Sequence, residues 1–248
     1  MNAAILETRS LTCAFGGLMA VDHVDFTLPE GEVRAVIGPN GAGKTTFFNL
    51  ITGVLPPTSG RILFRGEDIT GQPVHLISQK GIARTVQITS IFPTLTVADN
   101  IWLGVQSRGR LRPLARRSRM PAVRQQVAEI MALVGLQEQA EAEAAELSHG
   151  DQRLLEMALA LSTRPQLLLL DEPTAGLGAK ETHDMVRVVK GLAGRQTIVV
   201  VEHDMDVVME LADTISVLHL GKILAEGTPQ AIRDNALVQE VYLGRAGC

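Results

Sequence analysis

The chain has 248 residues, of which 46% are hydrophobic and 20% are charged, and its formal net charge is -4. This length supplies enough apolar material for a buried core, and the composition excludes a disordered, collagen-like or coiled-coil protein. Aromatic residues make up only 3% of the chain. We therefore expect no nucleic-acid partner, because base-stacking platforms need aromatic and basic side chains.

The cysteines and the apolar runs indicate where the protein works. Cys13 and Cys248 lie near opposite ends of the sequence without CxxC spacing, which predicts neither a disulfide framework nor a thiolate metal site. The first residues lack the basic region of a signal peptide, and the longest aliphatic runs, at 167–170 and 198–201, are far shorter than the roughly 20 residues that span a bilayer. We expect a chain in the reducing cytosol that does not cross a membrane by itself.

Short β-type runs open the chain and are separated by glycine and proline turns. They predict strands at about 10–15, 21–28 and 33–37. A helix is predicted next, from about residue 44 to residue 55, and Pro56 and Pro57 stop it. Another strand is expected at 61–64.

The second half of the chain changes character twice. From about residue 89 to residue 163 Ala, Leu, Gln and Glu dominate, which predicts a helical insertion with an amphipathic helix at 123–134. Afterwards, aliphatic runs typical of strands buried on both faces of a parallel sheet alternate with helices, which indicates an α/β core. The expected elements are strands at 167–170 and 197–202, a helix at 181–192, a hairpin at 215–219 and 222–226, and a terminal helix at 229–242.

Residues 38–45 match the pattern GxxxxGK(S/T) and lie between a predicted buried strand and a predicted helix. Glycines let such a loop curl tightly, so that its N–H groups and the positive end of the helix dipole converge on phosphate oxygens. Lys44 would reach the β- and γ-phosphates, and the Thr45 hydroxyl would take a position on Mg²⁺. The sequence therefore predicts a phosphate-binding loop.

Two acids follow the aliphatic run at 167–170. A carboxylate at the carboxyl end of a parallel strand lies where ligands bind in open α/β sheets, so Asp171 would orient Mg²⁺ and its waters. Glu172, the next residue, would act as general base on an attacking water.

With these two motifs in place, the sequence resembles the ATP-binding subunit of ABC transporters over about residues 6–245. The resemblance implies one α/β domain over 1–248, a P-loop NTPase (ABC ATPase) core with an antiparallel β-subdomain and an inserted helical subdomain. The expected division is an ATP-binding core at about 1–88 and 164–226, a helical subdomain at about 89–163 and a C-terminal helix at about 227–248.

Three further residues acquire roles from the resemblance. Gln87 falls at the Q-loop, where the family's glutamine touches Mg²⁺ or the attacking water and relays the nucleotide state to the membrane subunits. His203 falls at the switch histidine, which contacts the γ-phosphate and that water. Phe15 falls where an aromatic ring stacks on adenine, and a core phenylalanine is the alternative.

The segment Leu147, Ser148, His149, Gly150 and Asp151 occupies the place of the family's LSGGQ signature. The resemblance implies that it binds the γ-phosphate of the ATP held by the opposing subunit, and Ser148 and Asp151 also match a helix capping box. His149 stands where glycine is usual, which puts the local geometry in question. A second departure is Gly178, at a D-loop position where aspartate is usual and helps to couple the two nucleotide sites.

The implied site residues fall into four groups. The catalytic residues are Glu172, His203 and Gln87, and the Mg²⁺ residues are Thr45, Gln87 and Asp171. The signature residues are those at 147–151. The ATP-binding residues are Phe15, Gly38, Pro39, Asn40, Gly41, Ala42, Gly43, Lys44, Thr45 and Thr46.

The segments at 15–18, 84–87 and 202–205 and the ending at 226–229 and 241–244 resemble the branch that imports branched-chain amino acids, short amides and urea. The implied partners are two membrane permeases, a second ATPase in a heterodimer or homodimer, and indirectly an extracytoplasmic solute-binding protein. The implied location is peripheral, on the cytoplasmic face of the inner membrane. Branched-chain amino acids are the expected solute, and urea or short amides are the alternative, because the segments at 148–150 and 217–219 resemble urea-type members.

Two other functions are alternatives for this chain, and an arginine-rich segment is a candidate contact surface. An exporter ATPase for lipopolysaccharide shares the Tyr-Leu-Gly ending, and soluble ABC ATPases of ribosomes or DNA usually carry two halves or a long coiled coil, which this chain lacks. A run of six arginines is interpreted as a solvated loop or as a contact with lipid headgroups or an acidic permease face: Arg108, Arg110, Arg112, Arg116, Arg117 and Arg119.

Overall fold

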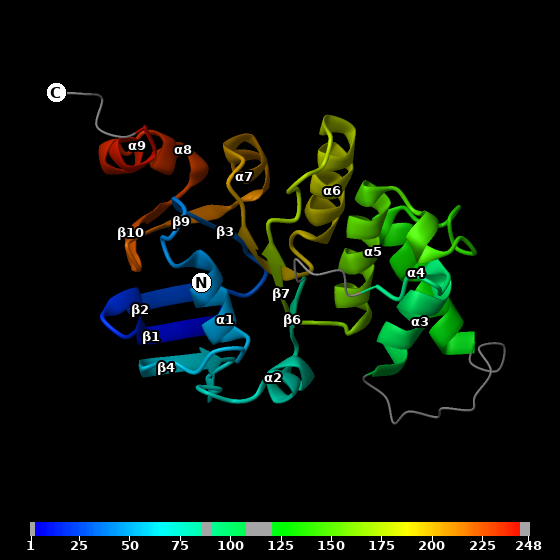
Figure 1. Cartoon of the computed structure of the whole chain (residues 1–248), viewed down its shortest axis with the longest axis horizontal. Coiled ribbons are helices and arrows are strands. Elements are labelled where there is room, and N and C mark those ends of the chain that lie inside the picture. Colours follow the sequence, from blue (N-terminus) through cyan, green and yellow to red (C-terminus); the bar gives the residue numbers. More distant parts are fainter. Residues whose placement is uncertain (1–2, 86–90, 108–120, 244–248) are drawn as a thin grey trace.

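The computed structural model describes residues 3–85, 91–107 and 121–243, and its strands form two β-sheets (Figure 1). The smaller sheet is antiparallel and has the strand order β2-β1-β4-β5. Its strands are β1 (Ala4–Phe15), β2 (Leu18–Pro29), β4 (Ser59–Phe64) and β5 (Glu67–Asp68). The sequence predicted most of this sheet, although β1 begins earlier than residue 10.

The larger sheet has the strand order β10-β9-β3-β8-β7-β6. The strands β6, β7, β8, β3 and β9 run parallel to one another, and β10 pairs with β9 antiparallel. The strands are β3 (Val33–Ile37), β6 (Ile82–Arg84), β7 (Leu167–Asp171), β8 (Thr197–Val201), β9 (Thr214–His219) and β10 (Lys222–Gly227).

The larger sheet lies between two hydrophobic cores, which explains its continuous aliphatic runs. Leu168 and Leu170 pack into the core shared with most of the helices, whereas Leu167 and Leu169 pack into the core shared with the antiparallel sheet. Because alternate side chains of a strand point to opposite faces, a strand covered on both sides has no polar position in its middle.

Helices cover the larger sheet and extend beyond one of its edges. α1 (Lys44–Ile51) packs in the core of the antiparallel sheet, whereas α3 (Val97–Ser107), α4 (Pro121–Val134) and α5 (His149–Ser162) pack against one another as a group (Figure 1). The other helices are α2 (Val74–Lys80), α6 (Ala179–Leu192), α7 (Met205–Leu211), α8 (Pro229–Arg233) and α9 (Ala236–Leu243). The structure therefore confirms an α/β fold with an antiparallel sheet and a helical insertion. None of the described helices has the length and apolarity needed to cross a bilayer.

Two predicted helix boundaries are wrong. α1 ends at Ile51 rather than near residue 55, because Gly53 adopts the left-handed φ of 72° that ends a helix before the prolines are reached. The C-terminal segment forms two helices instead of one. Asn235 breaks it, since its Oδ1 accepts from the N–H groups of Leu237 and Val238 and so begins α9 anew.

Candidate functional site

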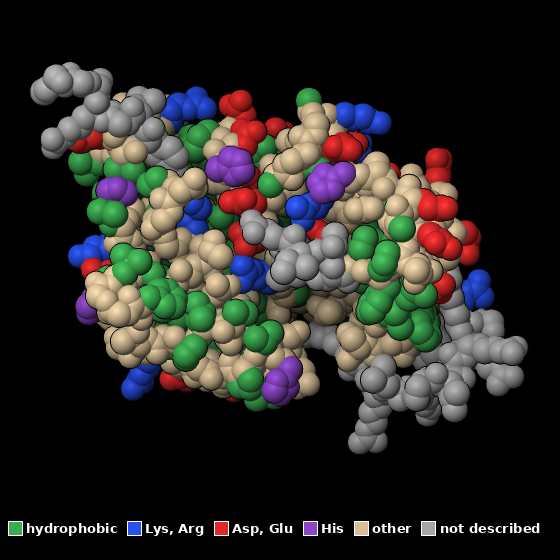
Figure 2. All heavy atoms as spheres, in the orientation of Figure 1, with side chains coloured by type: hydrophobic (Ala, Val, Ile, Leu, Met, Phe, Trp, Pro, Cys, Tyr) green, Lys and Arg blue, Asp and Glu red, His purple; other side chains and the backbone are tan. Residues whose placement is uncertain are grey.

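The site forms where three parallel strands end at the same edge of the larger sheet. The phosphate loop at 38–43 follows β3, Glu172 follows β7, and His203 follows β8 after one residue. In Figure 2, acidic, basic and histidine side chains gather near the centre of this face of the molecule. The topology thus brings together residues that lie more than 160 positions apart in the sequence.

The phosphate loop has a backbone that only glycine allows at its two ends. Gly43 has a φ of 104°, and a Cβ there would lie 2.2 Å from the carbonyl oxygen of Ala20. A Cβ on Gly38 would lie 2.1 Å from the carbonyl oxygen of Leu218. Gly43 also stands at the N-cap of α1 and has no side chain to cap it, so the first N–H groups of α1 can donate to an anion.

Lys44 is buried at the base of this loop. Its Nζ donates to the carbonyl oxygens of Gly38 at 2.7 Å and Pro39 at 3.1 Å, which keeps the loop curled around the ammonium group. Burial lowers the pKa of Lys44, and the carboxylates of Glu172 and Asp171 oppose that shift. A bound phosphate would add negative charge beside this buried cation.

The other loop residues differ in exposure in a way that fits their predicted roles. Thr45 is exposed and Thr46 is half-buried at the start of α1, while Ala42 is buried under the loop. Asn40 is exposed as well. The Thr45 hydroxyl is therefore accessible to a ligand, as the prediction requires.

Asp171 is 5% exposed and does not stand alone. Its Oδ2 accepts from Nη2 of Arg84 at 2.6 Å, and Nη1 of the same guanidinium donates to Oδ1 of Asn49 on α1 at 2.6 Å. Neither Arg84 nor Asn49 was singled out from the sequence. Their only signal was position, since Arg84 precedes the Q-loop by three residues and Asn49 follows Thr45 by one helical turn.

Glu172 has a backbone φ of 49°, a left-handed conformation that is rare for a residue with a side chain. Such strain costs of order 1–3 kcal/mol and gathers at functional sites. Its N–H donates to the carbonyl oxygen of Val201 at 2.8 Å, which fixes the turn to β8. The Oε1 atom of Glu172 lies 4.0 Å from Nδ1 of His203, so the structure places the two predicted catalytic residues side by side.

Glu202 is a buried residue of the candidate site that the sequence did not predict. It is 1% exposed, and its Oε1 accepts from both the N–H and the hydroxyl of Thr174, at 2.9 and 2.6 Å. Its Oε2 accepts from the N–H of His203 at 3.1 Å. This carboxylate therefore joins the turn after Glu172 to the loop that carries His203. The only signal in the sequence was an acidic residue directly after an apolar run.

The signature segment begins α5, in the helical group rather than beside α1. Ser148 is its N-cap, and the Ser148 Oγ accepts from the N–H of Asp151 at 3.1 Å, which is the first half of the predicted capping box. Ser148 and His149 are exposed, whereas Leu147 and Gly150 are buried. The free face of this helix end is available to a ligand from outside the chain.

The D-loop lies against the signature segment of the same chain. Glu181 Oε2 accepts from the N–H of Gly178 at 3.0 Å, whereas no side chain at position 178 caps the first N–H groups of α6, as an aspartate there would. A Cβ on Gly150 would meet the Glu181 side chain at 2.7 Å, which shows how closely α5 and α6 approach here.

Phe15 is 51% exposed at the end of β1, so the alternative of a core phenylalanine is wrong. It pairs with Leu18 across the hairpin, two residues before Ala20, which touches the phosphate loop. Gln87 and the arginine run from 108 to 119 lie outside the described residues.

The donor set fits Mg²⁺ that arrives with a nucleotide. Within residues 3–85, 91–107 and 121–243, no cluster of three or more acidic, histidine or cysteine side chains could hold a metal alone. The site offers one hydroxyl, from Thr45, and one carboxylate, from Asp171, and both are hard oxygen donors. Mg²⁺ is typically bound by one or two carboxylates together with substrate phosphates, which matches this set.

A curled glycine loop ahead of a helix, beside a strand that ends in two acids, defines a P-loop ATPase. Comparison with known proteins names the group: residues 21–175 match the family model for the ABC transporter, and residues 222–247 match that of the branched-chain amino acid ATP-binding cassette transporter. The chain belongs to the ABC transporter family, as one of its ATP-binding, ATP-hydrolysing proteins.

The similarity to curated relatives covers nearly the whole chain. It is 42% identical to the high-affinity branched-chain amino acid transport ATP-binding protein BraF of Pseudomonas aeruginosa, covering 99% of this chain and 100% of that protein. Identity to LivG of Escherichia coli, which carries the same description, is 40% with the same coverage.

Solved structures agree with the fold. A nucleotide-free ATP-binding cassette from an ABC transporter matches with a TM-score of 0.83, and a cassette in its ADP conformation matches with a TM-score of 0.87. Both are 30% identical to this chain, and each match covers 98% of this chain and 100% of the other.

Proposed function

We propose that this protein is the ATP-hydrolysing subunit of an importer for branched-chain amino acids. The observation that carries the proposal is the full-length similarity to two proteins described as branched-chain amino acid transport ATP-binding proteins, together with the match at 222–247. These relatives favour branched-chain amino acids over urea, short amides or exported lipopolysaccharide as the solute.

ATP would be held by the loop at 38–46 and by Phe15 at the adenine. Lys44 would pair with the β- and γ-phosphates, which explains a buried ammonium group at the base of the loop. Thr45 and Asp171, together with Gln87, would hold Mg²⁺, which when bound neutralises phosphate charge.

Hydrolysis would be carried by Glu172 and His203. Glu172 would take a proton from the attacking water as general base, because its carboxylate follows β7 at the edge where the phosphates lie. His203, 4.0 Å from that carboxylate, would position the water and the γ-phosphate. Glu202 would hold the His203 loop in place.

A single subunit has an incomplete site. The residues at 147–151 stand at the start of α5, in the helical group, and Ser148 is exposed there. We infer that they complete the ATP site of a second ATPase subunit, either a different chain or a second copy. ATP-driven closure of that pair, and reopening after hydrolysis, would switch two membrane permeases that receive the solute from an extracytoplasmic binding protein.

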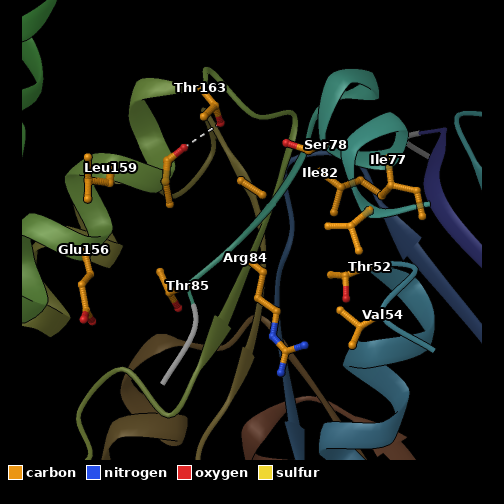
Figure 3. Close-up of a pocket in the computed structure, with 13 residues that line it drawn as sticks. Thr52, Val54, Ile77, Ser78, Ile82, Arg84, Thr85, Glu156, Leu159 and Thr163 are labelled. Atoms are coloured by element: carbon orange, nitrogen blue, oxygen red, sulfur yellow. Dashed lines mark hydrogen bonds between the residues drawn. The ribbon is translucent and has the colours of Figure 1, made fainter. Parts of the chain in front are cut away.

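The permeases would contact a groove of about 310 Å³ between α2, β6 and α5 (Figure 3). Its wall is largely apolar, with Ile77, Ile82 and Leu159, and it ends at Thr85, two residues before the predicted Q-loop glutamine. A membrane subunit seated there would hold the chain at the cytoplasmic face of the membrane and would sense the nucleotide through Gln87.

Isolation of the tagged chain from detergent-solubilised membranes tests this proposal. Two polytopic permeases and a second ATPase subunit are expected to copurify, and the associated solute-binding protein should bind leucine, isoleucine or valine. Copurification with ribosomes or nucleic acid instead, or a binding protein that takes urea, would contradict it.

A further inference from the structure

Arg84 links the groove of Figure 3 to the candidate metal site. It ends β6, and in Figure 3 its side chain extends away from Glu156 and Thr85. The Cζ atom of the guanidinium lies 5.6 Å from the ring centre of Phe48, and the Arg84 side chain is 11% exposed. One planar group is therefore held on its face by a ring while its edge donates to two acceptors, Asp171 and Asn49.

The two acceptors belong to the two elements that carry the predicted Mg²⁺ residues. Asp171 is itself one of those residues and ends β7. Asn49 lies four residues after Thr45 on α1, so the two side chains share one face of the helix. The guanidinium thus ties β7 to α1 at a fixed separation, as a rigid two-pronged donor can and a flexible point charge cannot.

We propose that Arg84 is a positioning residue that sets the spacing between Asp171 and Thr45, so that both meet Mg²⁺ on the bound nucleotide. This inference rests on the proposed function, because it takes Thr45 and Asp171 as the Mg²⁺ residues. Partners of metal ligands orient those ligands, and their loss typically costs about 10–100-fold in metal affinity or activity. Arg84 acts through Asp171 and Asn49, to which its guanidinium donates.

The simplest competing account is that Arg84 only neutralises a buried carboxylate. That account needs a positive charge and no particular shape. A lysine at position 84 keeps the charge beside Asp171 but cannot hold Asn49 in the same plane, so Arg84→Lys separates the two accounts. Asn49→Ala also distinguishes the two accounts, since it leaves the pair between Arg84 and Asp171 intact and removes only the second acceptor.

The test measures ATP binding to the full-length chain by calorimetry, with Mg²⁺ and again with EDTA. The measured quantity is the dissociation constant in EDTA divided by the dissociation constant with Mg²⁺. For Arg84→Lys and Arg84→Gln we expect that ratio to fall by about tenfold, the lower end of the range for metal-ligand partners, with binding in EDTA unchanged. Asn49→Ala should lose part of the ratio, and Arg61→Gln, which removes an exposed arginine on β4, should keep it.

A wild-type ratio in Arg84→Lys or in Asn49→Ala would overturn the proposal, and so would equal weakening with and without Mg²⁺. If Arg84→Gln fails to fold because Asp171 is left without its cation, the other two variants decide the matter. Asp171→Asn is measured alongside. If it keeps the full wild-type ratio, the Mg²⁺ assignment of the proposed function fails, whereas loss in Asp171→Asn without loss in the Arg84 variants sinks only the role of Arg84.

Discussion

At the scale of single residues, the site depends on charges held where burial makes them costly. Lys44 is an ammonium group with carbonyl partners, and Asp171 is a carboxylate with a guanidinium partner. A change in either charge should therefore give a measurable response.

The lowered pKa of Lys44 leads us to expect that ATP binding depends on pH. Burial lowers its pKa below the 10.5 of an ordinary lysine, so the ammonium group loses its proton earlier as the pH rises. ATP binding needs the charged form, so the affinity should be full below the lowered pKa and should fall as the pH rises through it. Calorimetric titrations between neutral and alkaline pH measure this. Lys44→Arg, which stays charged over that range, should give a flatter profile, and an equally steep fall in that variant would count against the role of Lys44.

Replacement of Glu202 should lower both the stability of the fold and the rate of ATP turnover. A glutamine there has one acceptor oxygen and an NH₂ group, so it cannot accept from Thr174 and from the His203 N–H at once. Glu202→Gln should lower the free energy of unfolding by about 1–3 kcal/mol and reduce ATP turnover while ATP affinity is kept. Urea denaturation and steady-state hydrolysis check this against Glu210→Gln, an exposed acid whose replacement should change little. Wild-type turnover in Glu202→Gln would show that His203 needs no such support.

The sequence located the reacting groups better than their supports. Lys44, Asp171 and Glu172 stand in short local patterns, so spacing was enough to predict them. Arg84, Asn49 and Glu202 act through contacts across elements that are up to 87 residues apart, as between Arg84 and Asp171. No local pattern encodes such pairs, because the strand order that creates them is a property of the whole sheet.

At the scale of elements, the phosphate loop is shaped by the strands beside it. The carbonyl oxygens that approach Gly38 and Gly43 belong to β9 and β2, so the loop is enclosed by two different sheets. The helix boundaries that differ from the prediction have local causes: α1 ends at a left-handed glycine, and α8 and α9 separate at an asparagine cap.

Gly43→Ala tests this enclosure. The new methyl group would lie 2.2 Å from the Ala20 carbonyl oxygen at a φ of 104°, so the loop or β2 must shift. We expect a cost of about 1–3 kcal/mol in the free energy of unfolding and a marked loss of ATP affinity. Gly17→Ala is the matched control, because a Cβ there meets nothing within 4 Å. Unchanged ATP binding in Gly43→Ala would contradict the fixed geometry of the loop.

At the scale of the whole molecule, Arg34 joins the two sheets. It lies on β3, and its guanidinium pairs with Glu32, Glu226 and the Ser216 hydroxyl while it stacks over Phe26 of the antiparallel sheet. Removal of one partner from a buried ion pair leaves an uncompensated charge. This cation therefore adds a polar link between the two sheets to the hydrophobic core that they share.

Arg34→Met should lower the free energy of unfolding by about 3 kcal/mol, since it strands the largely buried Glu32. Chemical denaturation measures the change, and Arg9→Met, which removes the exposed partner of Glu7, should give a much smaller one. A loss in Arg34→Met no greater than in Arg9→Met would show that the two sheets are held together by apolar packing alone.

The central claim is that ATP hydrolysis at Glu172 drives the import of branched-chain amino acids. Its most direct test is uptake of radiolabelled leucine by proteoliposomes that contain the complete transporter, with ATP inside, compared between the wild type and Glu172→Gln. We expect ATP-dependent uptake that Glu172→Gln reduces by about 100-fold or more, since general base catalysis contributes about 10²–10⁴, while ATP binding persists. Leucine uptake at the wild-type rate in Glu172→Gln, or ATP turnover in the wild type that moves no branched-chain amino acid, would contradict it.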